Sequence, residues 1–216
     1  MLMLCLSTSG PIASASLIED GKVVSFQRGE GGLTHSQTIM LLAEQTLQSA
    51  GYSPGDMDAF AVDAGPGSFT GVRIGVCAAN AMAAAFDKPV VWITSLEALL
   101  YGHHNACALI DCRNGNGYAM VLTENDIFLP PSAVVISELL DTLPANILIV
   151  GDGAVMHREA ISTKLPAARF LDENDVDAAK AGLAAWDKLL SGDTVKEAMP
   201  LYLRPSQAER LAKEKK

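Results

Sequence analysis

The stretch DAGPGSFTGVRIGV, from Asp63 to Val76, places four glycines, one proline and two hydroxyl side chains around a single arginine. It follows one apolar run and leads into an alanine-rich run, so we expect a loop between a strand at 58–64 and a helix at 72–86. A glycine loop at such a place can bring phosphate to a helix N-terminus. The glycine spacing fits neither a dinucleotide loop nor a Walker loop, so a tight structural turn is favoured.

Small residues recur at every fourth position of the predicted helix, namely Gly71, Gly75, Ala79 and Ala83. This spacing aligns small side chains along one face, where a second backbone can approach closely. We call this face the small-residue ridge. Two interpretations stay open from spacing alone: the ridge packs on the sheet of its own lobe, or it receives a helix of another protein.

Composition limits the possible functions. With 216 residues, 49% of them hydrophobic and 19% charged, the chain is globular and long enough for one large domain or two lobes. Its net charge of -9 argues against holding nucleic acid by its own field. No apolar run approaches the roughly 20 residues of a membrane span and no basic segment precedes the first apolar run, so we expect a cytoplasmic protein without a membrane segment.

Four cysteines, Cys5, Cys77, Cys107 and Cys112, lie in apolar surroundings without CxxC spacing. Their surroundings suit reduced, buried thiols, although the exposure of Cys77 stays open, and we expect no zinc or redox pair.

The first half alternates between strand and helix signals. Asp20-Gly21, between two apolar runs, predicts a hairpin, and Gly51 predicts the end of a helix. That helix carries Ile39, Leu42, Ala43, Thr46 and Leu47 on one face. The elements expected here are strands at 2–7, 13–19, 22–28, 58–64 and 88–94, helices at 34–50 and 72–86, and a short helix capped by Ser95.

The second half repeats this plan in outline. We expect strands at 106–112, 118–123, 126–129, 146–154 and 168–171, and helices after Ser137, at 154–165 and at 175–192. Each half opens with a hairpin or meander and continues into alternating helix and strand. The sequence therefore predicts an α/β chain of two similar lobes, 1–102 and 103–216, each a mixed sheet covered by helices. The final segment is a candidate to return to the first lobe.

The undecapeptide GPGSFTGVRIG, from Gly65 to Gly75, resembles the signature of the TsaB (YeaZ-type) family. Further landmarks agree in order and spacing across nearly the whole chain. They are LCLSTSG near the start, LTHSQTIMLL, LIDCRNGNGY, GDGA and PLYLR near the end.

The resemblance implies a fold and a role. The family has two RNase H-like lobes of the actin, Hsp70 and sugar-kinase superfold. Its members act as partners of the related enzyme TsaD, which carries the metal and forms threonylcarbamoyladenosine at position 37 of tRNA, while TsaE joins as an ATPase. We therefore expect a TsaD-like partner, a TsaE-like ATPase reached through the complex, and only indirect contact with tRNA. Family members have also been labelled M22 glycoproteases.

Several residues favour a non-catalytic role. The metal-binding relative needs a paired HxxxH, whereas His35 is followed four residues later by Ile39. Ser7 stands at the end of the first strand, where many relatives have Asp, and Asn116 stands where family hairpins often have Glu. Ser68 lacks the GxSxG frame of a hydrolase. We therefore expect no catalytic residue, no metal and no cofactor.

We interpret the opening loop as structural and interactive. Gly65, Pro66 and Gly67 shape the strand exit, and Ser68 or Thr70 caps the following helix. The resemblance implies that the small-residue ridge and the preceding helix form a four-helix interface with the partner. The expected interface residues are His35, Ile39, Leu42, Gly71, Arg73, Gly75, Ala79 and Ala83. The alternatives are a nucleotide-binding phosphotransferase or M22 peptidase-like enzyme of the same superfold, and a homodimeric scaffold.

Overall fold

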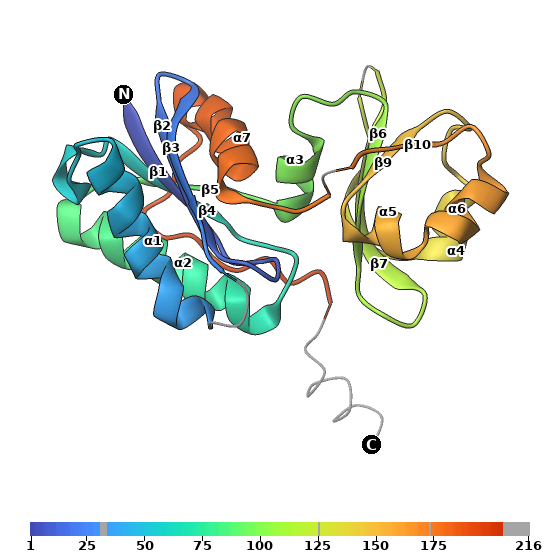
Figure 1. Ribbon diagram of the computed structural model, residues 1–216. Helices are drawn as coiled ribbons and strands as arrows, with labels where there is room; N and C mark the ends of the chain where they lie inside the picture. Colours follow the sequence, from blue (N-terminus) through green and yellow to red (C-terminus); the bar gives the residue numbers. More distant parts are fainter. Residues whose placement is uncertain (31–33, 125, 173, 205–216) are drawn as a thin grey trace, which may run out of the picture.

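The computed structural model describes residues 1–30, 34–124, 126–172 and 174–204 (Figure 1). These residues form two five-stranded mixed sheets, one in each lobe, with strand orders β3-β2-β1-β4-β5 and β10-β9-β6-β7-β8. Each sheet joins three antiparallel strands to two parallel ones, and the corresponding strands occupy corresponding places. The two-lobed α/β architecture predicted from the sequence is confirmed.

Helices cover both faces of the first sheet. The sheet consists of β1 (Leu2–Ser7), β2 (Ser14–Glu19), β3 (Lys22–Arg28), β4 (Ala59–Asp63) and β5 (Val90–Ile93). Helices α1 (His35–Ser49) and α2 (Phe69–Phe86) share a core with one face, and α7 (Ala178–Ser191) shares a core with the other. A short 3-10 turn, η1 (Pro54–Asp56), connects α1 to β4. Successive β1 residues alternate between the two cores, as a doubly covered strand requires.

Local signals explain these elements. Asp20 and Gly21 have φ of 47° and 78°, the left-handed pair that a two-residue hairpin needs, and they join β2 to β3. Helix α1 buries the five residues that its spacing predicts, and Gly51 follows it with φ of 76°. Both predictions are confirmed.

The second lobe departs from the predicted pattern in two places. Its strands are β6 (Ala106–Asp111), β7 (Asn116–Leu122), β8 (Ile127–Val135), β9 (Leu148–Val150) and β10 (Arg169–Phe170). The edge strand β8 is longer than expected and includes two prolines, which an edge position tolerates. The expected helix at 154–165 is divided into α5 (Asp152–Met156) and α6 (Arg158–Lys164) at His157, whose ring bonds to Asp111 on the sheet.

The lobes share more than one connection. Helix α3 (Ser95–Leu100) joins β5 to β6 and packs on one face of the second sheet, whereas α4 (Ile136–Leu140), α5 and α6 cover the other face. Beyond β10 the chain crosses back, and α7 lies on the first sheet (Figure 1). Val195 then pairs with Val90 at the edge of that sheet.

Helix α2 is long and apolar enough to cross a membrane by length and composition, with a mean hydropathy of 1.3 over 18 residues. In this fold it packs one face against β1 and β4, as core helices do.

Candidate functional site

The glycine-rich loop is built for close packing between backbones. Gly65 has φ of 93°, and a side chain on Gly67 would collide with the backbone of Ser9. The backbone N–H of Ser68 donates to the Ser9 carbonyl at 2.8 Å, and the Ser68 hydroxyl accepts from Gly71 N at 3.2 Å. Ser68, one of the two expected candidates, is therefore the N-cap of α2. Thr70, the other candidate, is exposed, and Pro66 of the loop is buried.

The small-residue ridge faces the chain's own sheet, so the expectation that it receives a partner helix is wrong. Side chains added at Gly71 and Gly75 would collide with Thr8, whose hydroxyl donates to the Gly71 carbonyl at 2.7 Å. Ala79 and Ala83 are 0% and 1% exposed. The close approach that the spacing indicates is made by the loop after β1.

Two α1 residues expected at the interface also lie in the core. Ile39 and Leu42 are buried among the residues that join α1, α2 and the first sheet. Their side chains pack α1 against the sheet, so they cannot contact a partner in this conformation.

His35 and Arg73, the two other expected interface residues, are more accessible but already engaged. The half-buried His35 ring bonds through Nε2 to the Gly10 carbonyl at 3.0 Å. The exposed Arg73 guanidinium lies 4.1 Å from the centre of the Phe69 ring, and its Nε donates to the Tyr202 hydroxyl at 2.6 Å.

The exposed side of α1 presents different apolar residues. Met40 and Leu41 are 50% and 51% exposed. They border a hollow of about 550 Å³ that Tyr52, Pro54 and Met82 also line. Neither residue was among the expected interface residues, although the unbroken run Ile39 to Ala43 carries more apolar residues than one buried stripe needs. Cys77, whose exposure the sequence left open, is exposed on α2, whereas Cys5 and Cys107 are buried.

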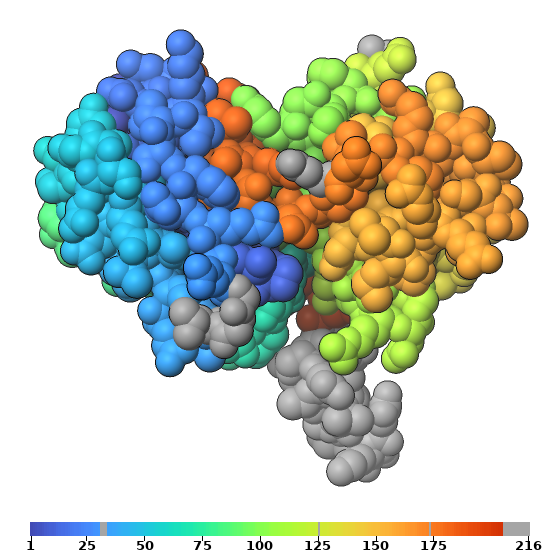
Figure 2. Space-filling view, viewed as in Figure 1, coloured from blue at the N-terminus to red at the C-terminus, as the bar shows by residue number. Residues whose placement is uncertain are grey.

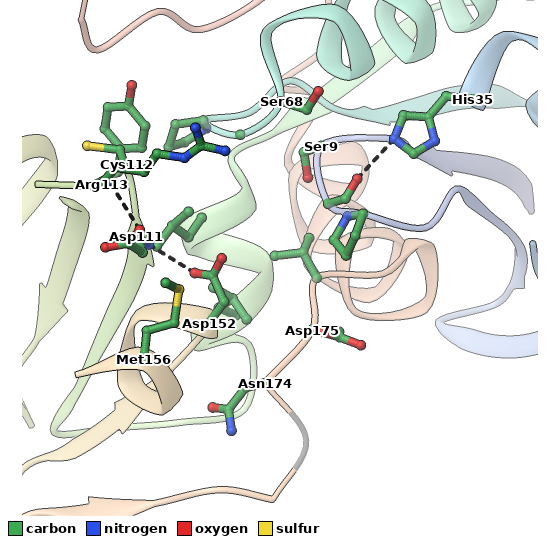
Figure 3. A pocket seen from close by; sticks show the side chains of 18 residues that line it. Ser9, His35, Ser68, Asp111, Cys112, Arg113, Asp152, Met156, Asn174 and Asp175 are labelled. Carbon is green, nitrogen blue, oxygen red and sulfur yellow. Dashed lines mark hydrogen bonds between the residues drawn. The ribbon is translucent and has the colours of Figure 1, made fainter. Parts of the chain in front are cut away.

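A second cavity, of about 610 Å³, lies between the lobes (Figure 2). The first lobe contributes Ser9, His35 and Ser68, and the second contributes Asp111, Arg113 and Asp152 (Figure 3). Asn174 and Asp175, on the segment that crosses back to the first lobe, also line the cavity.

Hydrogen bonds order the second-lobe wall of this cavity. Asp111 Oδ1 lies 2.7 Å from His157 Nε2, and Asp111 Oδ2 accepts from Arg113 N at 3.0 Å. The Asp111 N–H donates to Asp152 Oδ1 at 3.0 Å. Partial desolvation raises the pKa of Asp152, although the backbone hydrogen bonds that it accepts oppose the shift. The lining carries the three carboxylates Asp111, Asp152 and Asp175 and one guanidinium, that of Arg113.

Beneath the glycine-rich loop lies a buried carboxylate that the sequence analysis missed. Asp63, at the end of β4, is 0% exposed. Ser7 donates to its Oδ2 at 2.9 Å and Ser95 to its Oδ1 at 2.6 Å, and Ser9 and Gly65 N also donate to it. Burial raises the pKa of Asp63, although these hydrogen bonds oppose the shift.

This cluster gives Ser7 a structural role, because its hydroxyl donates to Asp63 on the neighbouring strand. It also corrects the expected cap of α3. Ser95 does not cap α3, because its hydroxyl also bonds Asp63, and Thr94 is the N-cap instead. Among the described residues, no three His, Cys, Asp or Glu side chains form a group that could hold a metal ion.

The matched sheets and the cavity between them define a class: the two-lobed α/β fold of actin-like kinases and ATPases. A solved activator of 2-hydroxyisocaproyl-CoA dehydratase from Clostridium difficile, with bound ADPNP, shares this fold at a TM-score of 0.53 and 11% identity, over 89% of this chain and 97% of that one. At this identity the likeness concerns the fold.

Within that class, residues 30–208 match the family model described as TsaD, tRNA N6-adenosine threonylcarbamoyltransferase, and the chain belongs to this family. It is 27% identical to the tRNA threonylcarbamoyladenosine biosynthesis protein TsaB of Bacillus subtilis (strain 168), over 97% of this chain and 96% of that protein. It also resembles the solved structure of YeaZ from Pseudomonas aeruginosa, at a TM-score of 0.75 and 25% identity, over 94% and 99% of the two chains. The resemblance to the TsaB family read from the sequence is confirmed.

Proposed function

We propose that this chain is a non-catalytic assembly partner of a TsaD-like enzyme in the formation of threonylcarbamoyladenosine at position 37 of tRNA. The similarity to a TsaB biosynthesis protein over nearly the whole of both chains supports this role. The chain would work in the cytoplasm, with a TsaE-like ATPase joining through the complex. Contact with tRNA would be indirect, because the net charge of -9 opposes binding to a polyanion.

The observation that carries the proposal is the exposed apolar surface on α1. Met40 and Leu41 are exposed and border a hollow of about 550 Å³, which would receive an apolar side chain from a helix of the partner. We call the surface formed by Met40, Leu41 and the lining of this hollow the α1 docking face. It replaces the small-residue ridge as the proposed partner site. The same face on a second copy of this chain would be self-complementary, so a homodimer would compete with the partner for it.

The surroundings of His35 support the non-catalytic part of the proposal. Its ring is held by the Gly10 carbonyl, and the residue one turn later, Ile39, belongs to the core. A second metal ligand at that position would have to leave the core to reach the first.

Reconstitution tests the proposal. The chain, a TsaD-like enzyme and a TsaE-like ATPase from the same organism are combined with tRNA, ATP and an activated threonylcarbamoyl donor, and threonylcarbamoyladenosine is measured by mass spectrometry. We expect product in the full mixture, and none from the chain alone or from the mixture without it. Metal-dependent turnover by the isolated chain, lost in His35→Ala, would contradict the non-catalytic role. Full activity without the chain would contradict the assembly role.

A further inference from the structure

Residues 195–204 run from the first lobe to the second after α7 (Figure 1). The segment begins on the first lobe, where Val195 and Val90 exchange two backbone hydrogen bonds of 2.8 Å. The side-chain amide of Asn80, on α2, then bonds both the N–H and the carbonyl of Ala198, each at 2.9 Å. Ala198 is 1% exposed and belongs to the core of the first lobe.

The middle of the segment lies against the glycine-rich loop. The Leu201 N–H donates to the Ala64 carbonyl at 2.8 Å. The Tyr202 ring stacks on Phe69, with ring centres 5.0 Å apart, and its hydroxyl accepts from Arg73 Nε. These contacts hold the segment to the first lobe as far as Tyr202.

The next two residues contact the second lobe. Leu203 packs against the cluster that contains Met120 and Leu148 of the second sheet. Arg204 Nη2 donates to Asn116 Oδ1 at 2.6 Å, and Nη1 lies 3.4 Å from Cys112 Sγ. Asn116 is the first residue of β7, and its own amide donates to the Asn114 carbonyl at 2.9 Å, so the acceptor is held in place.

The position of these contacts links them to the cavity. Cys112, beside the Arg204 guanidinium, lines the space between the lobes, as does Pro66 of the glycine-rich loop that Leu201 approaches. The segment therefore connects the first-lobe rim of the cavity to its second-lobe rim through backbone hydrogen bonds and side-chain contacts. The covalent connections, through α3 and through residues 171–177, can remain intact when these contacts break.

We propose that residues 195–204 form an interlobe strap, that Arg204 is its latch on Asn116, and that breaking the latch opens the cavity between the lobes. A hydrogen bond from a charged group stabilises more than one between neutral groups, so one side chain can shift the balance between closed and open lobes. The strap would act in this way whether or not a partner occupies the α1 docking face.

Spin labels on the two lobes test the latch. They are attached to p-acetylphenylalanine introduced at Gln45 on α1 and Glu159 on α6, two exposed positions, so that the native cysteines stay unlabelled. Distances are measured by double electron–electron resonance. In Arg204→Ala we expect the long-distance population to rise about tenfold, the effect of losing one charged hydrogen bond. Lys196→Ala removes an exposed positive charge from the same strap and should leave the distances unchanged.

Asn116→Ala removes the acceptor from the other lobe and should open the lobes as Arg204→Ala does. The double variant should open them no further, because both single changes break the same contact. Far-ultraviolet circular dichroism confirms that each variant is folded. Unchanged distances in Arg204→Ala would overturn the strap, and opening in Arg204→Ala without opening in Asn116→Ala would overturn the latch.

Discussion

Gly75→Ala tests how tightly the small-residue ridge packs on its own lobe. The added methyl group would meet the Thr8 hydroxyl, which is buried and donates to the Gly71 carbonyl. Overpacking of this kind costs about 1–3 kcal/mol, and a lost buried hydrogen bond adds about 1 kcal/mol. Replacing glycine by alanine inside a helix returns about 1 kcal/mol. The net loss is therefore about 2 kcal/mol, which for a chain of this length lowers Tm by about 4–8 °C.

The assay is thermal and urea unfolding of Gly75→Ala, Thr8→Ala and the double variant. Thr8→Ala removes the hydroxyl that meets the new methyl group, so the double variant should lose less stability than the two single losses added together. A Gly75→Ala variant as stable as the parent, or more stable through its helix propensity, would refute the close approach between α2 and Thr8.

Three other predictions follow from buried and charged groups. Because burial raises the pKa of Asp63 above its ordinary value of about 3.9, the folded state holds this proton more tightly than the unfolded chain does. The Asp63 contribution to stability is therefore greatest below the unfolded pKa and is lost as pH rises through the folded pKa. Urea unfolding should show that the free energy of unfolding of Asp63→Asn, relative to that of the parent, is higher at pH 7 than at pH 4. An equal difference at both pH values would contradict this sign. In the folded protein, the exposed Cys77 should react with a thiol reagent within minutes. Cys5 and Cys107 should react only on unfolding, because burial raises the pKa of both thiols, that of Cys107 to about 12. Mass spectrometry of labelled peptides measures the order of labelling, and early labelling of Cys107 would count against its burial. The isolated chain should bind tRNA no more tightly than the non-specific range of roughly 10⁻⁴ to 10⁻⁶ M at physiological salt, and sub-micromolar binding in a filter assay would show a local nucleic-acid site.

Local chemistry made much of the fold predictable. The hairpin at Asp20-Gly21 and the end of α1 at Gly51 both require left-handed backbone, which few residues adopt, so these signals are specific. The buried stripe of α1 follows from helical spacing because its apolar positions repeat on one face. The break at His157 was not predictable from such signals, because it accompanies a contact with Asp111, 46 residues earlier in the chain.

The candidate site was less predictable because helical spacing says which residues share a face but not what that face meets. Gly71, Gly75, Ala79 and Ala83 do share a face, yet it meets Thr8 and the first sheet. The Asp63 cluster depends on the register of two parallel strands, in which Leu6 pairs with Val62 and so brings Ser7 beside the carboxylate. The sequence shows Ser7 and Asp63 at the ends of two apolar runs, but it does not show that these two strands lie side by side in the sheet.

The affinity of the chain for a TsaD-like partner tests most directly whether the partner binds the α1 docking face. Leu41→Glu places a charge on this face, and Leu190→Glu makes the same change at a 62% exposed leucine on α7, which covers the other side of the first sheet. Because both leucines are largely exposed, both variants should remain folded with thermal midpoints close to the parent's.

Isothermal titration calorimetry of the two variants against the partner then gives the answer. We expect Leu41→Glu to weaken binding by about 30-fold or more, the loss of about 2 kcal/mol that marks an interface hot spot, while Leu190→Glu binds within about twofold of the parent. Parental affinity in Leu41→Glu, or equal weakening in both variants, would contradict the proposal that the partner binds through the α1 docking face.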